Sequence, residues 1–327
     1  MTLPRDLQWP VSRRVRRPGP FAPADPKAER ELCERIEGFF MRRLGAPVAL
    51  MPSGRAAIAA VLDYLGAGRG DLVFAPRWSS ACVWSAIGRT SNPTASFSPR
   101  PKFVIAVHKW GHRHGASHLS GVEVIEDSID SVFVDGTDLF PLGGSFEVIS
   151  LPKVTGAYCG GIVVTTDRSF LRQAAELRRR GCAYGRRLSR LKYERHFGRG
   201  EFLGAIDALE LENRSLDINA LRHIAACVPD LDRNASVIQQ RLSAASNLIG
   251  AAARVRGRGG RLPSVLPLPV RRYSLRGTAS LEQRHFDLSR RLERDLAEPC
   301  WVLPLHFGVS EPFFRRALAT LKRKPAR

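Results

Sequence analysis

One lysine stands just beyond a segment that is typical of a buried strand. The segment Phe146–Gly161 begins with an apolar, β-branched run, places Lys153 in a turn rich in small residues, and leads to a second predicted strand, Gly161–Thr166. A lysine removed from water shifts its pKa readily and can act as an amine nucleophile, so Lys153 is a candidate for Schiff-base formation. Taken alone, the position is more typical of a surface lysine whose stem packs on apolar neighbours.

A second group of residues has the composition of a phosphate-binding turn. Ser53-Gly54-Arg55-Ala56 follows a short predicted strand, Val48–Met51, and opens a predicted helix. Glycine allows an anion to approach the backbone, and the first helical turn offers N–H groups and the positive end of the helix dipole. By itself, a serine followed by glycine at a helix start is more often only an N-cap.

A carboxylate closes another predicted strand. The run Val122–Ile125 is typical of a buried strand and ends in Glu126 and Asp127. An acid held there can pair with a cationic ring nitrogen, which is the partner that pyridoxal phosphate needs if its ring is to withdraw electrons. From Asp127 alone, a helix cap or a salt bridge is an equally good explanation.

These three groups share one position in the predicted fold. Ligands of open α/β sheets bind beyond the carboxyl ends of the strands. Ser53-Gly54, Asp127 and Lys153 each follow such an end. A phosphate cradle, a ring acid and a Schiff-base lysine in this order are jointly far more specific than any one of them, and they predict a single cofactor site.

The elements that must position these residues alternate between strands and helices. Asp25 and Pro26 predict the start of an amphipathic helix, and Asp167 predicts the start of another. Further strands are predicted at 48–51, 72–75, 103–107 and 122–125. The alternation predicts the α/β class, with a three-layer α/β/α large domain and a mostly parallel sheet over residues 25–215.

The flanking segments have other patterns. Residues 1–24 are rich in proline and arginine and predict an irregular arm, and residues 182–200 predict a mobile loop. Helices are predicted at about 202–227, 230–253, 278–297 and 310–323, with a turn at 256–260 and an edge strand at 265–270. These elements predict a smaller α+β domain over residues 216–327.

The composition is that of a globular chain. Of its 327 residues, 44% are hydrophobic, and the mean hydropathy is −0.17. No apolar run reaches the length that spans a bilayer, and the N-terminus lacks the apolar core of a signal peptide. We therefore expect a cytoplasmic protein.

The net charge of +20 permits nucleic acid, anionic lipid or phosphorylated small molecules as partners. Only seven of the 51 basic residues are lysine, and the arginines are spread through predicted helices without interleaved aromatic residues. This distribution does not favour nucleic-acid binding.

Cysteine and histidine spacing indicates no metal centre. The six cysteines are scattered and contain no CxxC pair, so neither a zinc site nor a disulfide framework is expected. His108, His112, His114 and His118 lie in a polar connection, where we predict a solvated loop.

The ordered motifs resemble those of the DegT/StrS family of pyridoxal-phosphate sugar aminotransferases, which have the aspartate-aminotransferase fold. Residues 53–57 resemble its phosphate turn, residues 107–111 its VH-x-aromatic-G segment, and residues 124–127 its VIED motif. Gly70-Asp71 and Pro76 fall at its GD…P motif, and Lys153 precedes Gly160-Gly161 as the family's lysine precedes its paired glycines. The resemblance covers residues 30–217 well and the C-terminal part weakly, through residues 303–306.

The resemblance implies roles for particular residues. Lys153 would form the internal aldimine with pyridoxal phosphate and shuttle protons, and Asp127 would hold the pyridinium nitrogen. The backbone at Arg55 and Ala56 would bind the phosphate, and Ser150 would add a hydroxyl. The family also implies a homodimer that takes a nucleotide-linked sugar and an amino-acid donor as substrates.

The departures from the family pattern fall on ring and substrate contacts. Asp130 replaces a glutamine, and a second carboxylate near the cofactor's phenolate would be repulsive unless a cation intervenes. Ser80 replaces the aromatic residue that stacks on the ring; Trp78 or Trp84 is a candidate substitute, and either is as well explained as a core residue. Cys159 replaces a usual glutamate.

The loop expected from the partner subunit also departs, because Gly198 and Gly200 replace its asparagine and arginine. Arg199 is a candidate for the missing phosphate contact.

Three functions are consistent with the sequence. The first is an aminotransferase that moves an amino group to a keto sugar linked to a nucleotide, for cell-surface polysaccharide or secondary-metabolite sugar biosynthesis. The second keeps the cofactor with another substrate or chemistry. The third is a catalytically degenerate relative that uses its basic surface for binding, and retention of both Lys153 and Asp127 argues against it.

Overall fold

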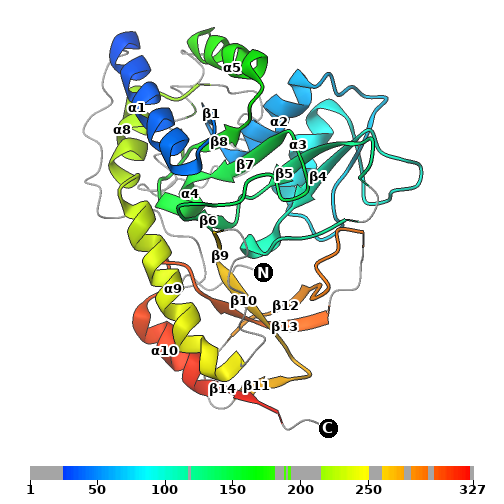
Figure 1. Ribbon diagram of the computed structural model, residues 1–327, viewed down its shortest axis with the longest axis vertical. Helices are drawn as coiled ribbons and strands as arrows, with labels where there is room; N and C mark the ends of the chain where they lie inside the picture. The colour runs from blue at the N-terminus through cyan, green and yellow to red at the C-terminus, as the bar shows by residue number, and fades with distance from the viewer. Residues whose placement is uncertain are drawn as a thin grey trace.

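A seven-stranded sheet forms the centre of the larger half of the protein (Figure 1). The computed structural model describes residues 25–116, 119–180, 188, 191–192, 215–249, 260–275, 281–293 and 298–324. The strand order is β1-β8-β7-β5-β4-β2-β3. The strands are β1 (Val48–Met51), β2 (Leu72–Phe74), β3 (Asn92–Thr94), β4 (Phe103–Val107), β5 (Glu123–Asp127), β7 (Phe146–Ser150) and β8 (Gly161–Val164).

The sheet is mostly parallel, as predicted. Strand β8 pairs antiparallel with β1 and β7, whereas β7, β5, β4, β2 and β3 pair in parallel. Helices cover both of its faces, so its strands are continuous apolar runs with little alternation. Every residue of β1, β7 and β8 is buried.

The central sheet lies between two layers of helices. Helices α2 (Gly54–Tyr64), α3 (Ala81–Thr90) and α5 (Arg168–Arg180) pack on one face of the sheet. Helices α1 (Pro26–Leu44) and α8 (Ile218–Cys227) lie side by side on the other face (Figure 1). The predicted three-layer α/β/α architecture is confirmed.

The first helix shows why the local prediction succeeds. The Asp25 carboxylate accepts a hydrogen bond from the Ala28 N–H at 3.0 Å, and Pro26 occupies the first turn. Gly45, with φ of +69°, ends the helix, because its N–H donates to the Met41 carbonyl in a left-handed conformation that glycine adopts at little cost. Ile36, Phe40 and Leu44 form the buried stripe.

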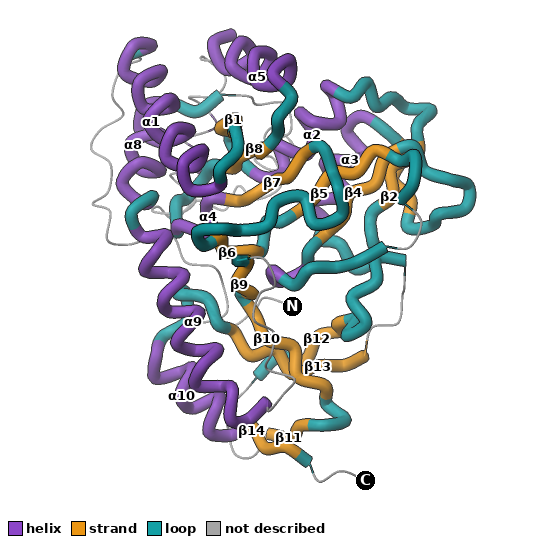
Figure 2. The backbone as a smooth tube through the Cα atoms, viewed as in Figure 1, coloured by secondary structure: helices purple, strands orange, loops and turns teal. Residues whose placement is uncertain are grey.

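The C-terminal part combines two helices with short antiparallel strands, seen in the lower half of Figure 2. Its elements are α9 (Asp230–Ile249), β9 (Arg261–Pro263), β10 (Val265–Pro269), β11 (Tyr273–Leu275), β12 (Gln283–Phe286), β13 (Glu298–Pro304), α10 (Glu311–Thr320) and β14 (Leu321–Arg323). Strands β10, β13 and β12 form one sheet in that order, and β11 pairs with β14. The predicted edge strand at 265–270 is confirmed as β10.

One predicted helix is wrong. Residues 281–293 contain strand β12 and a turn, where a helix was expected over 278–297. The Asp287 carboxylate accepts N–H groups of Ser289 and Arg291, which closes a turn directly after the strand, and β13 supplies the backbone partners of β12. A side chain that binds nearby amides in this way competes with helix formation.

Several other predictions fall wholly or largely on residues outside the described part of the chain. These are the arm at 1–24, most of 182–200, residues 202–214 of the first C-terminal helix, and the turn at 256–260, of which only Gly260 is described. Leu188, Leu191 and Lys192 are helical.

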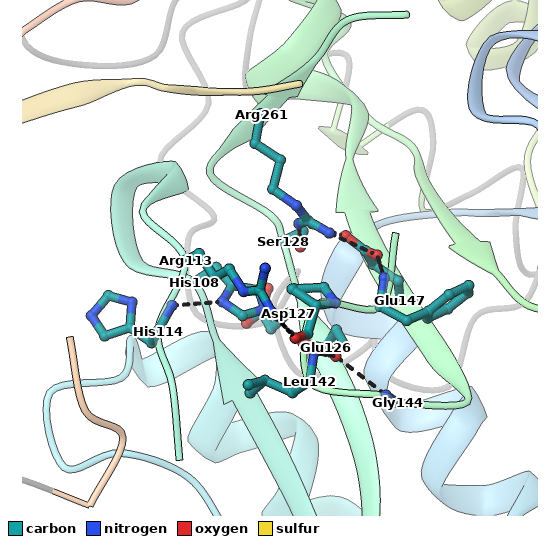
Figure 3. A network of polar contacts seen from close by, with 12 residues as sticks. His108, Arg113, His114, Glu126, Asp127, Ser128, Leu142, Gly144, Glu147 and Arg261 are labelled. Atoms are coloured by element: carbon teal, nitrogen blue, oxygen red, sulfur yellow. Dashed lines mark hydrogen bonds and ion pairs between the residues drawn. The ribbon is translucent and has the colours of Figure 1, made fainter. Parts of the chain in front are cut away.

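A buried ion pair joins the C-terminal strands to the central sheet. Strand β9 pairs with β6 (Ser131–Phe133), and Arg261 at its start is 2% exposed. Its Nη1 lies 2.7 Å from Oε1 of Glu147, a residue of β7 that is fully buried (Figure 3). Core side chains from before and after residue 216 form one cluster, and the division into domains at that residue stays a prediction.

We expect Arg261→Met to lower the free energy of unfolding by about 3–5 kcal/mol, because it leaves the Glu147 carboxylate buried without its counter-charge. The double variant Arg261→Met/Glu147→Gln should recover part of that loss, since the amide keeps an acceptor and carries no charge. Denaturant titration measures both. As a control, Arg315→Met removes an exposed pair with Glu311 on α10 and should change stability by no more than about 0.5 kcal/mol. Equal losses from Arg261→Met and Arg315→Met would contradict this account.

Candidate active site

Lys153 lies on a short helix at the end of the central strand β7. The strand ends at Ser150, and α4 (Leu151–Thr155) follows at once, so the predicted turn is a single helical turn. Pro152 suits its first turn, and Gly156 with φ of +77° closes it. This geometry carries the lysine just beyond the carboxyl end of a buried strand.

Two carboxylates flank the Lys153 amine. Its Nζ lies 2.5 Å from Oδ1 of Asp130, and the side chains are 29% and 20% exposed respectively. Oδ2 of Asp130 accepts the N–H of Trp110 at 3.2 Å, which orients the carboxylate. Burial opposes charge on Lys153, but the charge and hydrogen bond of Asp130, with a further contribution from Asp127, raise its pKa above the ordinary lysine value.

Asp127 is the more deeply buried acid. It ends β5, is 3% exposed, and accepts the Ile129 N–H at 3.1 Å through Oδ1. Burial raises the pKa of Asp127 to about 7, against the lowering effects of that hydrogen bond and of the Lys153 charge. A cation placed beside it would therefore be bound by a carboxylate that is otherwise short of solvation.

The predicted phosphate turn packs against Ile129 and Ser150, which are close in sequence to Asp127 and Lys153. Ser53 caps α2, because its Oγ accepts the Ala56 N–H at 3.1 Å, and the Gly54 and Arg55 amides precede the first helical hydrogen bond. A Cβ on Gly54 would lie 3.0 Å from the Ile129 side chain and 3.7 Å from Cβ of Ser150. The structure thus brings Ser53-Gly54, Asp127 and Lys153 together, as the sequence predicts.

The paired glycines make this approach possible. Strand β8 begins at Gly161, where a Cβ would lie 2.5 Å from the carbonyl carbon of Ser53. No side chain larger than glycine fits at that distance. Gly160 forms a bridge with Ser53, so the start of β8 holds the turn in place.

Trp78, Ser80 and Trp84, which were also predicted as site residues, lie just before α3 or within it. Ser80 is exposed and precedes α3 without a side-chain cap. The ring of Trp78 contacts the His114 ring at 5.0 Å and Lys109 Nζ at 5.1 Å, whereas Trp84, a residue of α3, is half-buried and packs against the core cluster that includes α2. No contact in the described residues decides which of them meets a cofactor ring, so these roles stay predictions.

Three residues near the site were not anticipated. Cys82, in the first turn of α3, lies close enough to Lys153 to help raise its pKa. Lys192 is buried and places Nζ 3.4 Å from the Pro52 carbonyl, beside the phosphate turn. Lys109 lies over the rings of Trp78 and Trp110, and burial lowers its pKa to about 8. Only Lys109 left a signal in the sequence, namely a lysine between a buried strand and a tryptophan.

The histidine run is buried, so the predicted solvated loop is wrong for its described members. His108, His112 and His114 are each exposed by 2% or less, and His118 lies outside the described residues. His108 donates from Nε2 to Glu126 at 2.6 Å and accepts the His114 N–H at Nδ1 (Figure 3). His112 and His114 each form one hydrogen bond with a backbone carbonyl, which compensates in part for their removal from water, and both rings pack on Phe286.

Glu126 and Asp127 are adjacent in the sequence, but their side chains have different partners. Successive strand residues point to opposite faces, and Glu126 faces His108 and the amides of Leu142 and Gly144 (Figure 3). Asp127 faces Lys153 and Ile129. In the described part of the chain, no three His, Cys, Asp or Glu side chains are grouped to hold a metal ion.

Comparison with known proteins identifies the fold family. A family profile described as "Putative PLP-dependent aminotransferase" matches residues 39–324. The chain belongs to this family of aminotransferases. No curated protein sequence matches it significantly.

Solved structures of aminotransferases share the fold at low sequence identity. The aminotransferase TlmJ from Streptoalloteichus hindustanus aligns with a TM-score of 0.54 and 17% identity, over 92% of this chain and 95% of that one. A DegT DnrJ EryC1 StrS aminotransferase from Brucella abortus gives 0.54 and 16%, over 88% and 89%. The "Putative sugar aminotransferase Spr1654" from Streptococcus pneumoniae gives 0.53 and 13%, over 93% and 96%. The predicted aminotransferase class and its cofactor, pyridoxal phosphate, are confirmed.

The residues of this aminotransferase fit that cofactor. A buried acid of raised pKa, Asp127, suits a cationic ring nitrogen, and the Lys153 amine suits the aldehyde. A Cβ at Gly54 would lie 3.0 Å from the Ile129 side chain, so the close packing of this helix start requires glycine, and the backbone amides of its first turn suit a phosphate. Within the described residues, no helix is long and apolar enough to cross a membrane.

The raised pKa of Asp127 predicts a pH-dependent stability in the cofactor-free aminotransferase. Because the folded-state pKa of about 7 exceeds the ordinary value of 3.8, the contribution of this carboxyl is fully present below about pH 4 and is lost as pH rises through 7. Asp127→Asn, which mimics the neutral acid, should gain stability over the parent between pH 4 and 8, by up to roughly 4 kcal/mol. Denaturant unfolding across that range measures the difference.

Asp71→Asn is the matched control. The Gly68 N–H and then Lys102 lower the pKa of Asp71, so this variant should be less stable than the parent at any pH above about 4, by an amount that stays constant between pH 4 and 8. A pH-independent difference between Asp127→Asn and the parent would show that Asp127 is not held in an unfavourable charged state.

We expect Asp130→Asn to lower the pKa of the Lys153 amine by about one unit or more, since it removes the nearest opposite charge. The rate at which added pyridoxal phosphate becomes attached to Lys153, followed after borohydride reduction by peptide mass spectrometry, should then reach half its maximum at lower pH. Asp138→Asn, at an exposed acid paired with Arg113, should leave the midpoint unchanged. A midpoint that stays or rises in Asp130→Asn would contradict the assignment.

Proposed function

We propose that this aminotransferase transfers an amino group from an amino acid to the keto group of a nucleotide-linked sugar. We place the reaction in the cytoplasm, in the biosynthesis of a cell-surface polysaccharide or a secondary-metabolite sugar, and the working unit in a homodimer. The observation that carries the proposal is the convergence of Lys153, Asp127 and the Ser53-Gly54 helix start on one end of the sheet.

The proposal assigns a role to the side chain or the backbone amide of each residue in the site. The Lys153 amine would hold the cofactor through its aldehyde carbon and, when not bonded to it, would take up and return a proton at the substrate carbon. Asp127 would hold a proton on the ring nitrogen, and a cofactor held in this way would supply electron withdrawal from the substrate. The amides of Gly54 and Arg55 and the hydroxyl of Ser150 bind the phosphate, with Lys192 adding positive charge beside the turn.

Asp130 would hold the proton that Lys153 must give up. The ion pair keeps Lys153 charged, and a carboxylate at 2.5 Å can accept that proton when the amine attacks. The same ion pair supplies the cation that the sequence required between Asp130 and a phenolate oxygen. Trp78 and Ser80 remain the candidates beside the ring.

Lys109 is the competing nucleophile, and the two lysines differ in a way that can be tested. The pKa of Lys109 is lowered to about 8 by burial, so more of it is uncharged at neutral pH than of Lys153. However, its Nζ donates to the His285 carbonyl and lies over the rings of Trp78 and Trp110. The acid whose charge acts on it, Asp130, is hydrogen-bonded to Lys153 instead. These contacts therefore favour Lys153 as the lysine that binds the cofactor.

The proposed substrate is supported by the net charge of the chain and by its similarity to a solved structure. A net charge of +20 attracts a substrate that carries a pyrophosphate. A solved structure of similar fold is described as a "Putative sugar aminotransferase".

Purified protein supplied with pyridoxal phosphate should show a visible absorption band that borohydride abolishes. The reduced label should map to the peptide that contains Lys153. Lys153→Ala should lose the band, and the matched variant Lys109→Ala should keep it. Labelling of Lys109 instead of Lys153 would overturn the site.

The substrate is tested separately. With glutamate as donor the band should convert to the pyridoxamine form, and nucleotide-linked keto sugars should then restore it. Restoration by a 2-keto acid alone, with no response to any keto sugar, would favour a different substrate. A protein that takes up no cofactor yet binds DNA with strong salt dependence would favour the degenerate binding protein.

A further inference from the structure

The C-terminal strands hold a short turn that lies beside the lysine and its acid. Residues Lys109–Gly111 form a single 3₁₀ turn shortly after β4. The Lys109 ammonium donates to the carbonyl of His285, a residue of β12, at 3.0 Å. The Trp110 carbonyl accepts the N–H of Ser264, between β9 and β10, at 2.9 Å. The turn is therefore fixed from one side by segments that come much later in the sequence.

Trp110, in the middle of this turn, has a left-handed backbone. Its φ is +57° and its ψ is 23°, which is uncommon for a residue other than glycine. Such a conformation persists only where the surrounding contacts hold it. The Trp110 ring stacks on Phe286 of β12, with ring centres 5.2 Å apart and planes at 9°, and Lys109 Nζ lies 4.8 Å from its centre. These contacts account for the conformation.

The residue after Trp110 leaves the turn no room to shift. Gly111 has a φ of +81°, and a Cβ there would lie 2.9 Å from the carbonyl oxygen of Leu262 in β9. The same Cβ would lie 3.1 Å from the carbonyl oxygen of Asp130. The turn is thus packed between a C-terminal strand and the backbone of the acid that pairs with Lys153.

The left-handed turn directs a backbone amide at that acid. The Trp110 N–H donates to Oδ2 of Asp130 at 3.2 Å, while Oδ1 of Asp130 lies 2.5 Å from Lys153 Nζ. A carboxylate held through both of its oxygens cannot rotate away from the amine. Burial lowers the pKa of Lys153, and nearby Asp130, Asp127 and Cys82 raise it, with Asp130 contributing the most.

We propose that Trp110 is a positioning residue for Lys153, because the C-terminal strands hold its backbone in the left-handed conformation and its N–H then holds Asp130 against the amine. Trp110 acts through Asp130 and does not itself react. Through this contact, strand β12 affects the reactivity of an amine that belongs to the central sheet. The inference rests on the proposed role of Lys153 as the lysine that carries the cofactor.

Two variants that both lose the indole ring but differ in backbone preference test the proposal. Asparagine adopts the left-handed conformation readily, whereas β-branched valine strongly disfavours it. Full-length protein is supplied with pyridoxal phosphate over a range of pH and reduced with borohydride, and attachment at Lys153 is measured by peptide mass spectrometry. The pH of half-maximal attachment rate should fall by about half a unit or more in Trp110→Val and stay within about 0.2 units of the parent in Trp110→Asn.

A double variant shows whether the effect passes through the acid. Because Asp130→Asn already removes the charge beside Lys153, adding Trp110→Val to it should cause no further fall in the midpoint. An equal fall with and without Asp130 would overturn the proposal, as would equal midpoints in Trp110→Val and Trp110→Asn.

Phe286→Leu provides a second route if Trp110→Val does not fold. This variant leaves the turn itself intact and removes the ring on which Trp110 stacks. The midpoint should fall in the same direction by a smaller amount, and an unchanged midpoint would overturn the proposal.

Trp301→Val is the matched control for loss of a tryptophan in the C-terminal strands. Trp301 is a half-buried residue of β13 whose indole N–H donates to the Tyr273 carbonyl. Its loss should leave the midpoint unchanged even if the protein becomes less stable, and a fall equal to that of Trp110→Val would overturn the proposal. Attachment at Lys109 instead of Lys153 would count against the proposed function, whereas attachment at Lys153 with the wrong midpoints would count only against the role of Trp110.

Discussion

A single buried guanidinium ties the C-terminal strands to the strands that carry the chemistry. Arg261 binds Glu147 on β7, the strand that leads to Lys153, and the hydroxyl of Ser128, the residue that follows Asp127. It also donates to the Asp138 carbonyl and lies 5.2 Å from the centre of the Phe133 ring. Because a buried charge needs its partners in place, strand β9 can lie in only one position relative to the lysine and the acid.

The local charges around Lys153 depend on one another. Asp127 is held in a place that favours its neutral form, and Asp130 is held beside a lysine that favours its charged form. The two acids can be close together because the amine lies near both. In the protein without its cofactor, the cation beside Asp130 is Lys153.

The predictions that succeeded follow from local rules. The strands around Lys153 and Asp127 were found because burial on both faces produces uninterrupted apolar runs, and α1 was found because its caps and its stripe agree. The failures have an equally physical cause. A helix over 278–297 was expected from side-chain spacing, but Asp287 closes a turn and β13 provides a partner strand. The histidines were expected in water, but they are paired with Glu126, backbone carbonyls and aromatic rings that are distant in the sequence.

The sequence by itself determined the class of chemistry, because a lysine, an acid and a Ser-Gly helix start each follow a strand, and parallel strands end at one edge of their sheet. Which groups touch was decided only by the tertiary structure. Packing sets the partners in the Lys153–Asp130 pair, in the approach of Cys82 to the amine and in the Arg261–Glu147 pair. Strand ends can be placed from local patterns, whereas distances between side chains depend on how every layer packs.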